Sequence, residues 1–293
     1  MRYRAVKTLA GKGAGRDQFR TALTGLAIGP DGDLYAVGDR QVKAFDTDSG
    51  RLRRQWPTAR PGRCVAVDRD GRVLVGQAGQ IEIFDERGQR LDLWSDKEKL
   101  GLVTTIAFFE AELFIGDAQH RCIRRFTSDR RHRNDIGTGT NTRGFAIPNG
   151  RLDFCVDGQG TIVAAHSGKH RVERYAPDGR LLGRFGHFGM RDPADFRGCC
   201  NPTNIALTPD GKIVVTEKAG PRTKVYDAEG TLLAVMGEEY FHANCRNMDV
   251  AVDEAGRIYV ADTVRLHVQV FALEAGQATL ESEPVFSERV AER

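Results

Sequence analysis

The stretch Asn204-Ile-Ala-Leu-Thr-Pro-Asp-Gly211 is followed by Lys212-Ile-Val-Val-Thr-Glu217, then by Thr223-Lys-Val-Tyr226 and Thr231-Leu-Leu-Ala-Val-Met236. Short apolar or alternating runs separated by Gly-containing turns are typical of antiparallel β-hairpins. The stretch therefore predicts a unit of four short antiparallel strands. A single unit of this size cannot bury both of its faces, so it requires similar neighbours.

The same unit recurs along the whole chain. A small residue anchors the first run of each unit, at Ala27, Ala66, Ala107, Cys155, Ala206 and Ala251. The third run of each unit ends in an aromatic residue, at Phe45, Phe84, Phe126, Tyr175, Tyr226 and Phe271. Both markers indicate six units, and radial stacking of six sheets predicts an all-β, six-bladed β-propeller of four-stranded antiparallel blades. We expect the aromatic residues and the leucines of the fourth strands to fill the space between neighbouring sheets.

The two ends of the chain differ from the repeating unit. The sixth unit has three clear strands, and the run from Tyr3 to Leu9 looks like a missing fourth strand. We therefore expect an N-terminal strand to complete the sixth blade and close the ring, which removes the free edges of an open propeller. Residues 1–275 are predicted to form one propeller domain and residues 276–293 an irregular C-terminal tail.

Composition narrows the class of protein. The chain has 293 residues, of which 40% are hydrophobic and 28% charged, as expected for a soluble globular protein. Its formal net charge of +3 gives no strong nucleic-acid signal. No transmembrane segment is predicted, because no run approaches the ~20 apolar residues that span a bilayer. The first residues lack an apolar signal core, which predicts a cytoplasmic protein, or an exported one whose signal peptide has been removed.

The stretch from Gly25 to Asp39, Gly-Leu-Ala-Ile-Gly-Pro-Asp-Gly-Asp-Leu-Tyr-Ala-Val-Gly-Asp, resembles an NHL repeat. Ile258-Tyr-Val-Ala-Asp262 with Val268-Gln-Val-Phe271 is a still closer match, and the resemblance covers nearly the whole chain. It implies a six-bladed propeller of the NHL-repeat family. NHL propellers include lyases, binding platforms and scaffolds, so the resemblance implies no single activity.

The hairpin order places two kinds of loop around the mouth of the central channel: the loop that enters the first strand and the loop between the second and third strands. We call this the channel-mouth face and expect function there. Two largely polar rings face it. One holds Gly25, Cys64, Thr105, Asp153, Asn204 and Asp249, and the other, at the ends of the second strands, holds Asp39, Gln77, Asp117, His166, Glu217 and Asp262.

The rings have a structural and a functional interpretation. Acidic residues at the ends of second strands are expected to accept hydrogen bonds from backbone amides of nearby loops. Alternatively, Asp153, Asn204 and Asp249 are candidate oxygen ligands for a hard cation such as calcium in the channel. The second interpretation predicts a metal-dependent lyase or a lactonase-like hydrolase.

The loop Phe196-Arg-Gly-Cys-Cys-Asn-Pro202 enters the fifth unit, and Cys200 occupies the same position as Cys245 in the next unit. Together with Cys199 and His242, these residues form a ligand set suited to zinc, copper or an iron–sulfur cluster. Buried thiols and a disulfide between Cys200 and Cys245 are the alternatives. No CxxC pair is present.

The sequence thus predicts an NHL-repeat binding module that takes a protein or small-molecule partner on its channel-mouth face. A cysteine-based metal or redox site is a candidate addition. The metal-dependent enzyme and a purely structural scaffold for protein interactions stay open as alternatives. No nucleophile elbow, zinc-protease or phosphate-loop motif appears, so whether the protein is an enzyme stays open and no catalytic residue is assigned.

Overall fold

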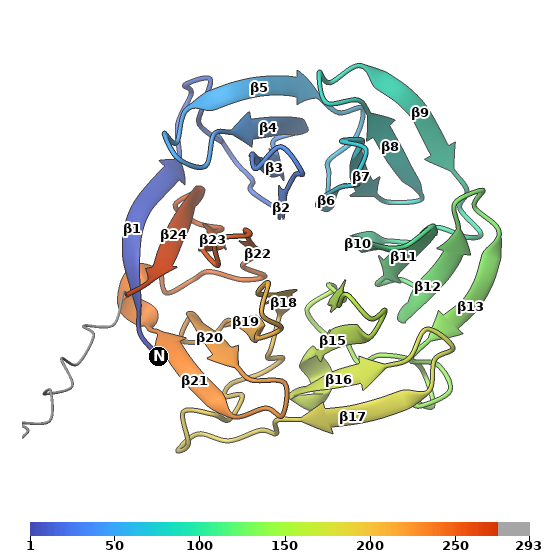
Figure 1. The fold of residues 1–293 in the computed structure, drawn as a ribbon, viewed down its shortest axis with the longest axis vertical. Helices are drawn as coiled ribbons and strands as arrows, with labels where there is room; N and C mark the ends of the chain where they lie inside the picture. Colours follow the sequence, from blue (N-terminus) through green and yellow to red (C-terminus); the bar gives the residue numbers. More distant parts are fainter. Residues whose placement is uncertain (275–293) are drawn as a thin grey trace, which may run out of the picture.

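The computed structural model describes residues 1–274, which form six four-stranded antiparallel sheets arranged in a ring around a common centre (Figure 1). Each sheet is one blade, with its first strand innermost and its fourth strand outermost. The prediction of a six-bladed propeller is confirmed. The tail predicted at 276–293 lies outside the described residues.

The first three blades follow one another along the chain. Blade one comprises β2 (Gly25–Ile28), β3 (Leu34–Gly38), β4 (Gln41–Phe45) and β5 (Leu52–Pro57). Blade two comprises β6 (Cys64–Val67), β7 (Val73–Gln77), β8 (Gln80–Phe84) and β9 (Arg90–Ser95). Blade three comprises β10 (Val103–Phe109), β11 (Glu112–Asp117), β12 (Cys122–Thr127) and β13 (His132–Ile136).

The last three blades include two short 3-10 helices, η1 (Ser167–Lys169) and η2 (Glu238–Tyr240). Blade four comprises β14 (Asp153–Val156), β15 (Ile162–His166), β16 (Arg171–Tyr175) and β17 (Leu181–Phe185). Blade five comprises β18 (Asn204–Leu207), β19 (Ile213–Glu217), β20 (Arg222–Tyr226) and β21 (Leu232–Met236). Blade six comprises β22 (Val250–Val252), β23 (Ile258–Asp262), β24 (His267–Leu273) and β1 (Tyr3–Ala10).

The ring closes through its N-terminal strand, as predicted. β1 pairs with β24 in antiparallel register, with Leu9 opposite Val268, so the two ends of the described chain meet in one sheet (Figure 1). Leu9 is 2% exposed and packs into the cluster between blades six and one. The pairing satisfies the backbone hydrogen-bonding groups on the outer edge of β24 and joins the first and last blades.

Packing between blades follows the repeat, with one correction. All six aromatic residues that end the third strands are buried, as predicted. The fourth-strand leucines do not fill the space between sheets in the same way, because Leu91, Leu93 and Leu182 are exposed. Instead, the outer strand contributes a buried residue near its end, as Trp56 does in β5 and Trp94 does in β9. The outer strand has one face toward solvent, so only alternate residues reach the core.

Among residues 1–274 there is no helix of the length and apolar character needed to cross a membrane.

Candidate functional site

The first predicted ring lies where the innermost strands begin. Its six members, Gly25, Cys64, Thr105, Asp153, Asn204 and Asp249, are all buried at the centre of the ring of blades. The small residues two positions later allow the innermost strands to approach closely, which brings the polar side chains of different blades together.

Arg151 joins this ring across the centre. Its Nη2 donates to Asp249 Oδ1 at 2.7 Å, and its Nη1 donates to the carbonyl oxygens of Thr24 at 2.8 Å and Arg63 at 3.0 Å. One guanidinium from the strand entry of blade four thus contacts blades one, two and six. Burial alone would lower the pKa of Arg151, but the carboxylates of Asp249 and Asp153 raise it. The centre of the propeller is therefore held by a buried cation of the chain itself.

The three candidate calcium ligands have partners within the protein. Asp249 Oδ1 also accepts from Asn204 Nδ2 at 2.8 Å, and Asp249 Oδ2 accepts from the backbone amide of Leu26 at 2.7 Å. Asp153 Oδ2 accepts from the backbone amide of Ile205 at 3.0 Å, and its Oδ1 accepts from the Thr105 hydroxyl. Burial raises the pKa of Asp153 to about 6, against the lowering effect of Arg151.

These contacts bear on the calcium hypothesis. Asn204 Oδ1 is buried and receives no hydrogen bond from the described residues. One free amide oxygen falls short of the six to eight oxygen ligands that Ca²⁺ takes. Arg151 already places a positive charge beside Asp249. The set therefore fits an internal ion pair better than a cation site, and calcium binding stays a prediction from the sequence.

Arg151 also divides the channel into two cavities. A cavity of about 280 Å³ lies on the side of the ring away from the channel mouth, between the inner strands. A second cavity, of about 260 Å³, opens on the channel-mouth face and we call it the mouth pocket. Arg151 lines both cavities, so its side chain and its partners form the partition between them.

The mouth pocket is basic. Arg63 and Arg246 line it with exposed side chains, and no aspartate or glutamate is among its lining residues. Within residues 1–274, neither guanidinium is in an ion pair. Asn149 Nδ2 donates to Asn247 Oδ1 at 3.0 Å across the pocket, which leaves the Asn247 amide group as a further donor. The arrangement suits a small anionic group such as a carboxylate.

The second predicted ring has the structural role expected of it. Asp117 accepts from the backbone amides of Gly101 and His120, and Asp262 accepts from those of His242 and Arg265. Asp39 holds the loop before β2 in the same way, accepting from the backbone amide of Ala22 at 2.9 Å. The acidic second-strand ends thus fix the loops of the channel-mouth face.

His166 and Glu217 lie at the same ring position in blades four and five, but they make different contacts from the aspartates. His166 Nε2 accepts from the backbone amide of Ala146 at 2.8 Å, so its proton is on Nδ1, 3.0 Å from Glu173 Oε2. Glu217 pairs with the buried Lys224 at 2.7 Å. Burial lowers the pKa of Lys224 to about 8. Both groups are enclosed between blades and neither reaches the mouth pocket.

The cysteine hypothesis requires Cys199, Cys200 and Cys245 to share one site, but the structure gives Cys200 and Cys245 different polar neighbours. Cys199 is exposed, Cys200 is half-buried and Cys245 is buried, and all six cysteines of the chain are free. Cys200 has Cys199 and Lys218 as its polar neighbours. Cys245 instead lies against Asp262, and burial raises its pKa to about 11. A raised pKa disfavours the thiolate that a metal requires.

His242 lies in the same turn as Cys245, whose backbone amide donates to the His242 carbonyl at 2.9 Å. In the described part of the chain, no three or more His, Cys, Asp or Glu side chains are grouped so that they could hold a metal ion. Zinc, copper or iron–sulfur binding by Cys199, Cys200, Cys245 and His242 therefore stays a prediction, without support from this arrangement.

Sequence reasoning missed Arg151, Arg63 and Arg246. A signal for Arg151 was present, because it is the only charged residue two positions before the first polar ring; the other five are Leu23, Gly62, Val103, Pro202 and Asn247. Arg63 and Arg246 precede the same ring in the loops of blades two and six. Alignment of the loop residues, as well as of the strand residues, would have indicated all three.

Comparisons with known proteins agree with the fold. Residues 249–271, which include most of blade six, match the NHL repeat. A stretch of 129 residues, 43% of the chain, is 27% identical to Protein brain tumor of Drosophila melanogaster. The match covers only 12% of the length of that protein.

Two solved structures have a similar fold. The Streptogramin B lyase structure has a TM-score of 0.61 and 12% identity over 85% of this chain and 93% of that chain. A structural genomics protein of unknown function from Bacteroides thetaiotaomicron VPI-5482 has a TM-score of 0.67 and 13% identity over 92% of this chain and 75% of that chain. Such low identities show the fold alone. With the repeat match and the closed ring of six blades, they lead to one conclusion: the chain is a six-bladed β-propeller with an NHL repeat in its sixth blade.

Proposed function

We propose that the protein is a binding module whose channel-mouth face takes an acidic segment of a partner protein. An aspartate or glutamate side chain of the partner enters the mouth pocket and pairs with Arg63 and Arg246. The observation that carries the proposal is the charge of the pocket: it is lined by Arg63 and Arg246, which are exposed and in no ion pair within residues 1–274, and by no carboxylate.

The loops around the pocket extend the positive field. Exposed arginines of the channel-mouth loops are Arg16, Arg20, Arg40, Arg60, Arg143, Arg191 and Arg265, whereas the exposed acids there are Asp17, Glu98, Asp192, Glu238 and Glu239. Like-signed groups around a concave site attract a partner of opposite charge and raise its association rate.

A protein partner explains the site better than a nucleic acid. Sites for single-stranded nucleic acid combine positive charge with aromatic side chains on which bases stack. The mouth pocket has no aromatic lining residue. Its volume of about 260 Å³ suits a single acidic side chain.

The test is binding of a fluorescent peptide of alternating glutamate and serine, measured by anisotropy. We expect the variant Arg63→Glu/Arg246→Glu to bind the peptide at least about tenfold more weakly, because charged hydrogen bonds are lost and repulsion is added. Arg87→Glu, an exposed substitution on the other face, is the matched control and should bind like the wild type.

A single-stranded RNA of matched charge is the competing probe. Tighter binding of the RNA than of the peptide, with the same dependence on Arg63 and Arg246, would assign the face to nucleic acid and overturn the proposal. Equal binding of the peptide by wild type and variant would overturn it as well, and would leave the scaffold interpretation.

The enzyme alternative is less well supported, because Arg151 pairs with Asp249, one of the two carboxylates that a channel cation would need. The cysteine hypothesis has its own test in metal analysis of anaerobically purified protein. Stoichiometric metal that is lost in Cys200→Ser would support it, and a metal-free wild type would overturn it.

A further inference from the structure

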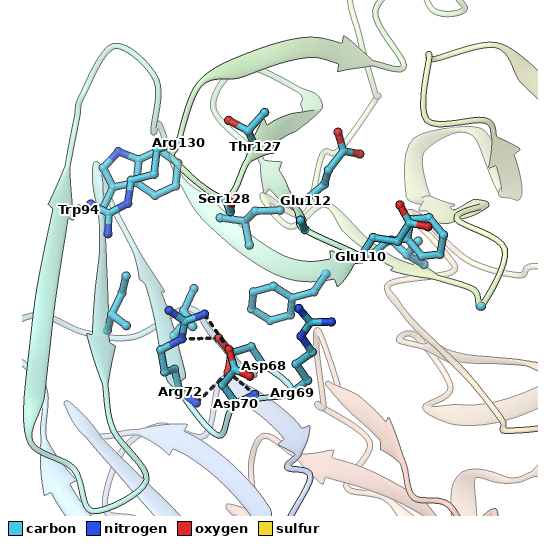
Figure 2. Close-up of a pocket in the computed structure, with 18 of the residues that line it drawn as sticks. Asp68, Arg69, Asp70, Arg72, Trp94, Glu110, Glu112, Thr127, Ser128 and Arg130 are labelled. Atoms are coloured by element: carbon cyan, nitrogen blue, oxygen red, sulfur yellow. Dashed lines mark hydrogen bonds and ion pairs between the residues drawn. The ribbon is translucent and has the colours of Figure 1, made fainter.

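A large pocket lies away from the channel-mouth face. It has a volume of about 640 Å³ and opens between blades two and three, on the face formed by the loops that join first to second and third to fourth strands. We call it the inter-blade pocket. Its apolar floor is formed by Leu74, Ile83, Trp94, Phe108 and Leu113. Figure 2 shows Trp94 with Arg130 on one side of the pocket, Asp68 with Arg72 at its base, and Glu110 and Glu112 across from them.

Blade six shows how the same place is filled elsewhere in the molecule. The loop Asp68-Arg-Asp-Gly-Arg-Val-Leu74 of blade two corresponds to Asp253-Glu-Ala-Gly-Arg-Ile-Tyr259 of blade six. In both loops the arginine Nε donates to the aspartate Oδ2, at 2.7 Å in blade two and 2.5 Å in blade six. The arginine backbone amide donates to Oδ1 of the same aspartate, at 2.9 Å and 2.8 Å respectively.

The strand register confirms that the two positions are equivalent. Leu74 lies opposite Ala66, and Tyr259 lies opposite Ala251, the small residue of its own blade. In blade six the Tyr259 hydroxyl donates to Asp253 Oδ2 at 2.8 Å. In blade two Leu74 has no hydroxyl, so Asp68 Oδ2 keeps the Arg72 bond and lacks the second one.

Blade one repeats the tyrosine arrangement. Tyr35, opposite Ala27, donates its hydroxyl to Asp31 at 2.9 Å, and Arg54 lies over its ring. Two blades of the propeller therefore fill this place with a tyrosine whose hydroxyl binds a loop aspartate. Blade two retains the aspartate at the position of Asp253, whereas Asp31 of blade one lies two positions later in its loop, and the pocket opens beside Leu74.

We propose that the inter-blade pocket binds a tyrosine side chain of an extended peptide segment from a partner protein. The ring packs on the apolar floor beside Leu74 and Trp94, and the hydroxyl donates to Asp68 Oδ2. The site is separate from the mouth pocket, so the proposal goes beyond the function proposed above.

The size and rim of the pocket favour a peptide over a lone phenol. A volume of about 640 Å³ lies in the range of pockets that enclose a drug-sized ligand, which is larger than one aromatic ring. Exposed charges of both signs, Arg69, Asp70 and Glu110, line the rim and can meet the flanking backbone and side chains. Glu110 has a φ of 52°, in the two-residue turn between β10 and β11. A glutamate in this left-handed region is uncommon, and such residues cluster at ligand-binding sites.

The test uses a capped Gly-Gly-Tyr-Gly-Gly peptide and its phenylalanine analogue. The chain has two tryptophans, so the indole N–H resonance of Trp94 reports on the pocket while that of Trp56, between blades one and two, is an internal reference. Loss of one resonance in Trp94→Phe assigns the pair. We expect the tyrosine peptide to shift the Trp94 resonance saturably. We expect the phenylalanine peptide to bind about tenfold more weakly, because it leaves Asp68 without the hydroxyl.

Leu74→Tyr should abolish peptide binding, because the new side chain takes the place that Tyr259 has in blade six. The melting temperature of this variant should not fall below that of the wild type. Leu91→Tyr, which adds the same side chain at an exposed position of the outer strand of blade two, is the matched control and should bind like the wild type. Ser128→Trp, at an exposed rim position, blocks the pocket without a change in the core and should weaken binding as well.

Three results would overturn the proposal: no shift of Trp94 with the tyrosine peptide, equal affinity for the phenylalanine peptide, or undiminished binding by both blocking variants. A shift with p-cresol but not with the peptide would also overturn it, and would assign the pocket to small phenols.

Discussion

At the scale of single residues, the centre of the propeller depends on a few buried charges. Arg151 and Asp249 form an ion pair with side chains 8% and 9% exposed, and Arg151 also satisfies two backbone carbonyls from other blades. A buried ion pair is weak evidence for stability in itself, but removal of one partner leaves an uncompensated buried charge.

We predict that Arg151→Met lowers the free energy of unfolding by about 3–5 kcal/mol, because Asp249 is left buried without its counter-charge. Chemical denaturation of the single variants and of Arg151→Met/Asp249→Asn measures the coupling between the two residues. The double variant should lose much less than the sum of the single losses. Additive losses would contradict the ion pair.

Glu173 provides a prediction for pH. Burial alone would raise its pKa, but hydrogen bonds from His166, Tyr175 and Arg171 lower it to about 2. A carboxyl group with a lowered pKa in the folded state stabilises the protein fully above its unfolded value of 4.5, and the contribution is lost as the pH falls toward 2.

We therefore expect Glu173→Gln to lose on the order of 2 kcal/mol of stability at pH 7, and to lose less stability than the wild type between pH 4.5 and pH 2. Urea denaturation at a series of pH values measures both effects. Glu229→Gln, an exposed change, is the control. A parallel pH dependence for wild type and Glu173→Gln would show that Glu173 is not the group concerned.

At the scale of elements, closure of the ring rests on β1. Its inner face places Leu9 in the core between blades six and one, whereas Val6 on the same strand is 39% exposed. The strand thus contributes both backbone pairing to β24 and apolar contact across the junction.

We predict that Leu9→Ala destabilises the protein by about 2–4 kcal/mol, the usual cost of truncating a buried leucine. Val6→Ala should stay within about 0.5 kcal/mol of the wild type, since its side chain is largely outside the core. Guanidinium denaturation of the two variants is the measurement. Similar small losses in both would mean that β1 closes the ring by backbone pairing alone.

At the scale of the whole molecule, the two pockets lie on opposite faces of the ring. Arg63 and Arg246 of the mouth pocket are in no ion pair within residues 1–274, whereas the inter-blade pocket combines an apolar floor with charges of both signs. The two pockets have no lining residue in common, so each could hold a partner at the same time.

We expect the acidic peptide and the tyrosine peptide to bind independently and to respond differently to salt. Interactions between exposed charges are screened beyond about 10 Å at 0.1 M salt. A rising salt concentration should therefore weaken binding of the acidic peptide strongly and binding of the tyrosine peptide little. A titration of each peptide in the presence of saturating amounts of the other measures this. Competition between them would contradict two separate sites.

The sequence by itself determined the architecture. Turns such as Pro209-Asp-Gly211, the small residues of the inner strands and the aromatic ends of the third strands are local signals repeated in each unit, so they predicted six blades, their strand order and the closing strand. It also indicated the structural role of Asp117 and Asp262, because part of that role lies in the hairpin next to each residue, where the backbone amides of His120 and Arg265 donate to them.

Only the tertiary structure decided what the centre and the pockets contain. Arg151 contacts Asp249 and Thr24, which are 98 and 127 positions away in the chain, and such contacts exist only once the ring has closed. The open place beside Leu74 likewise depends on how blade three packs on blade two. Spacing within a repeat specifies each sheet, whereas the distance between side chains of different blades is set by the radius and packing of the ring.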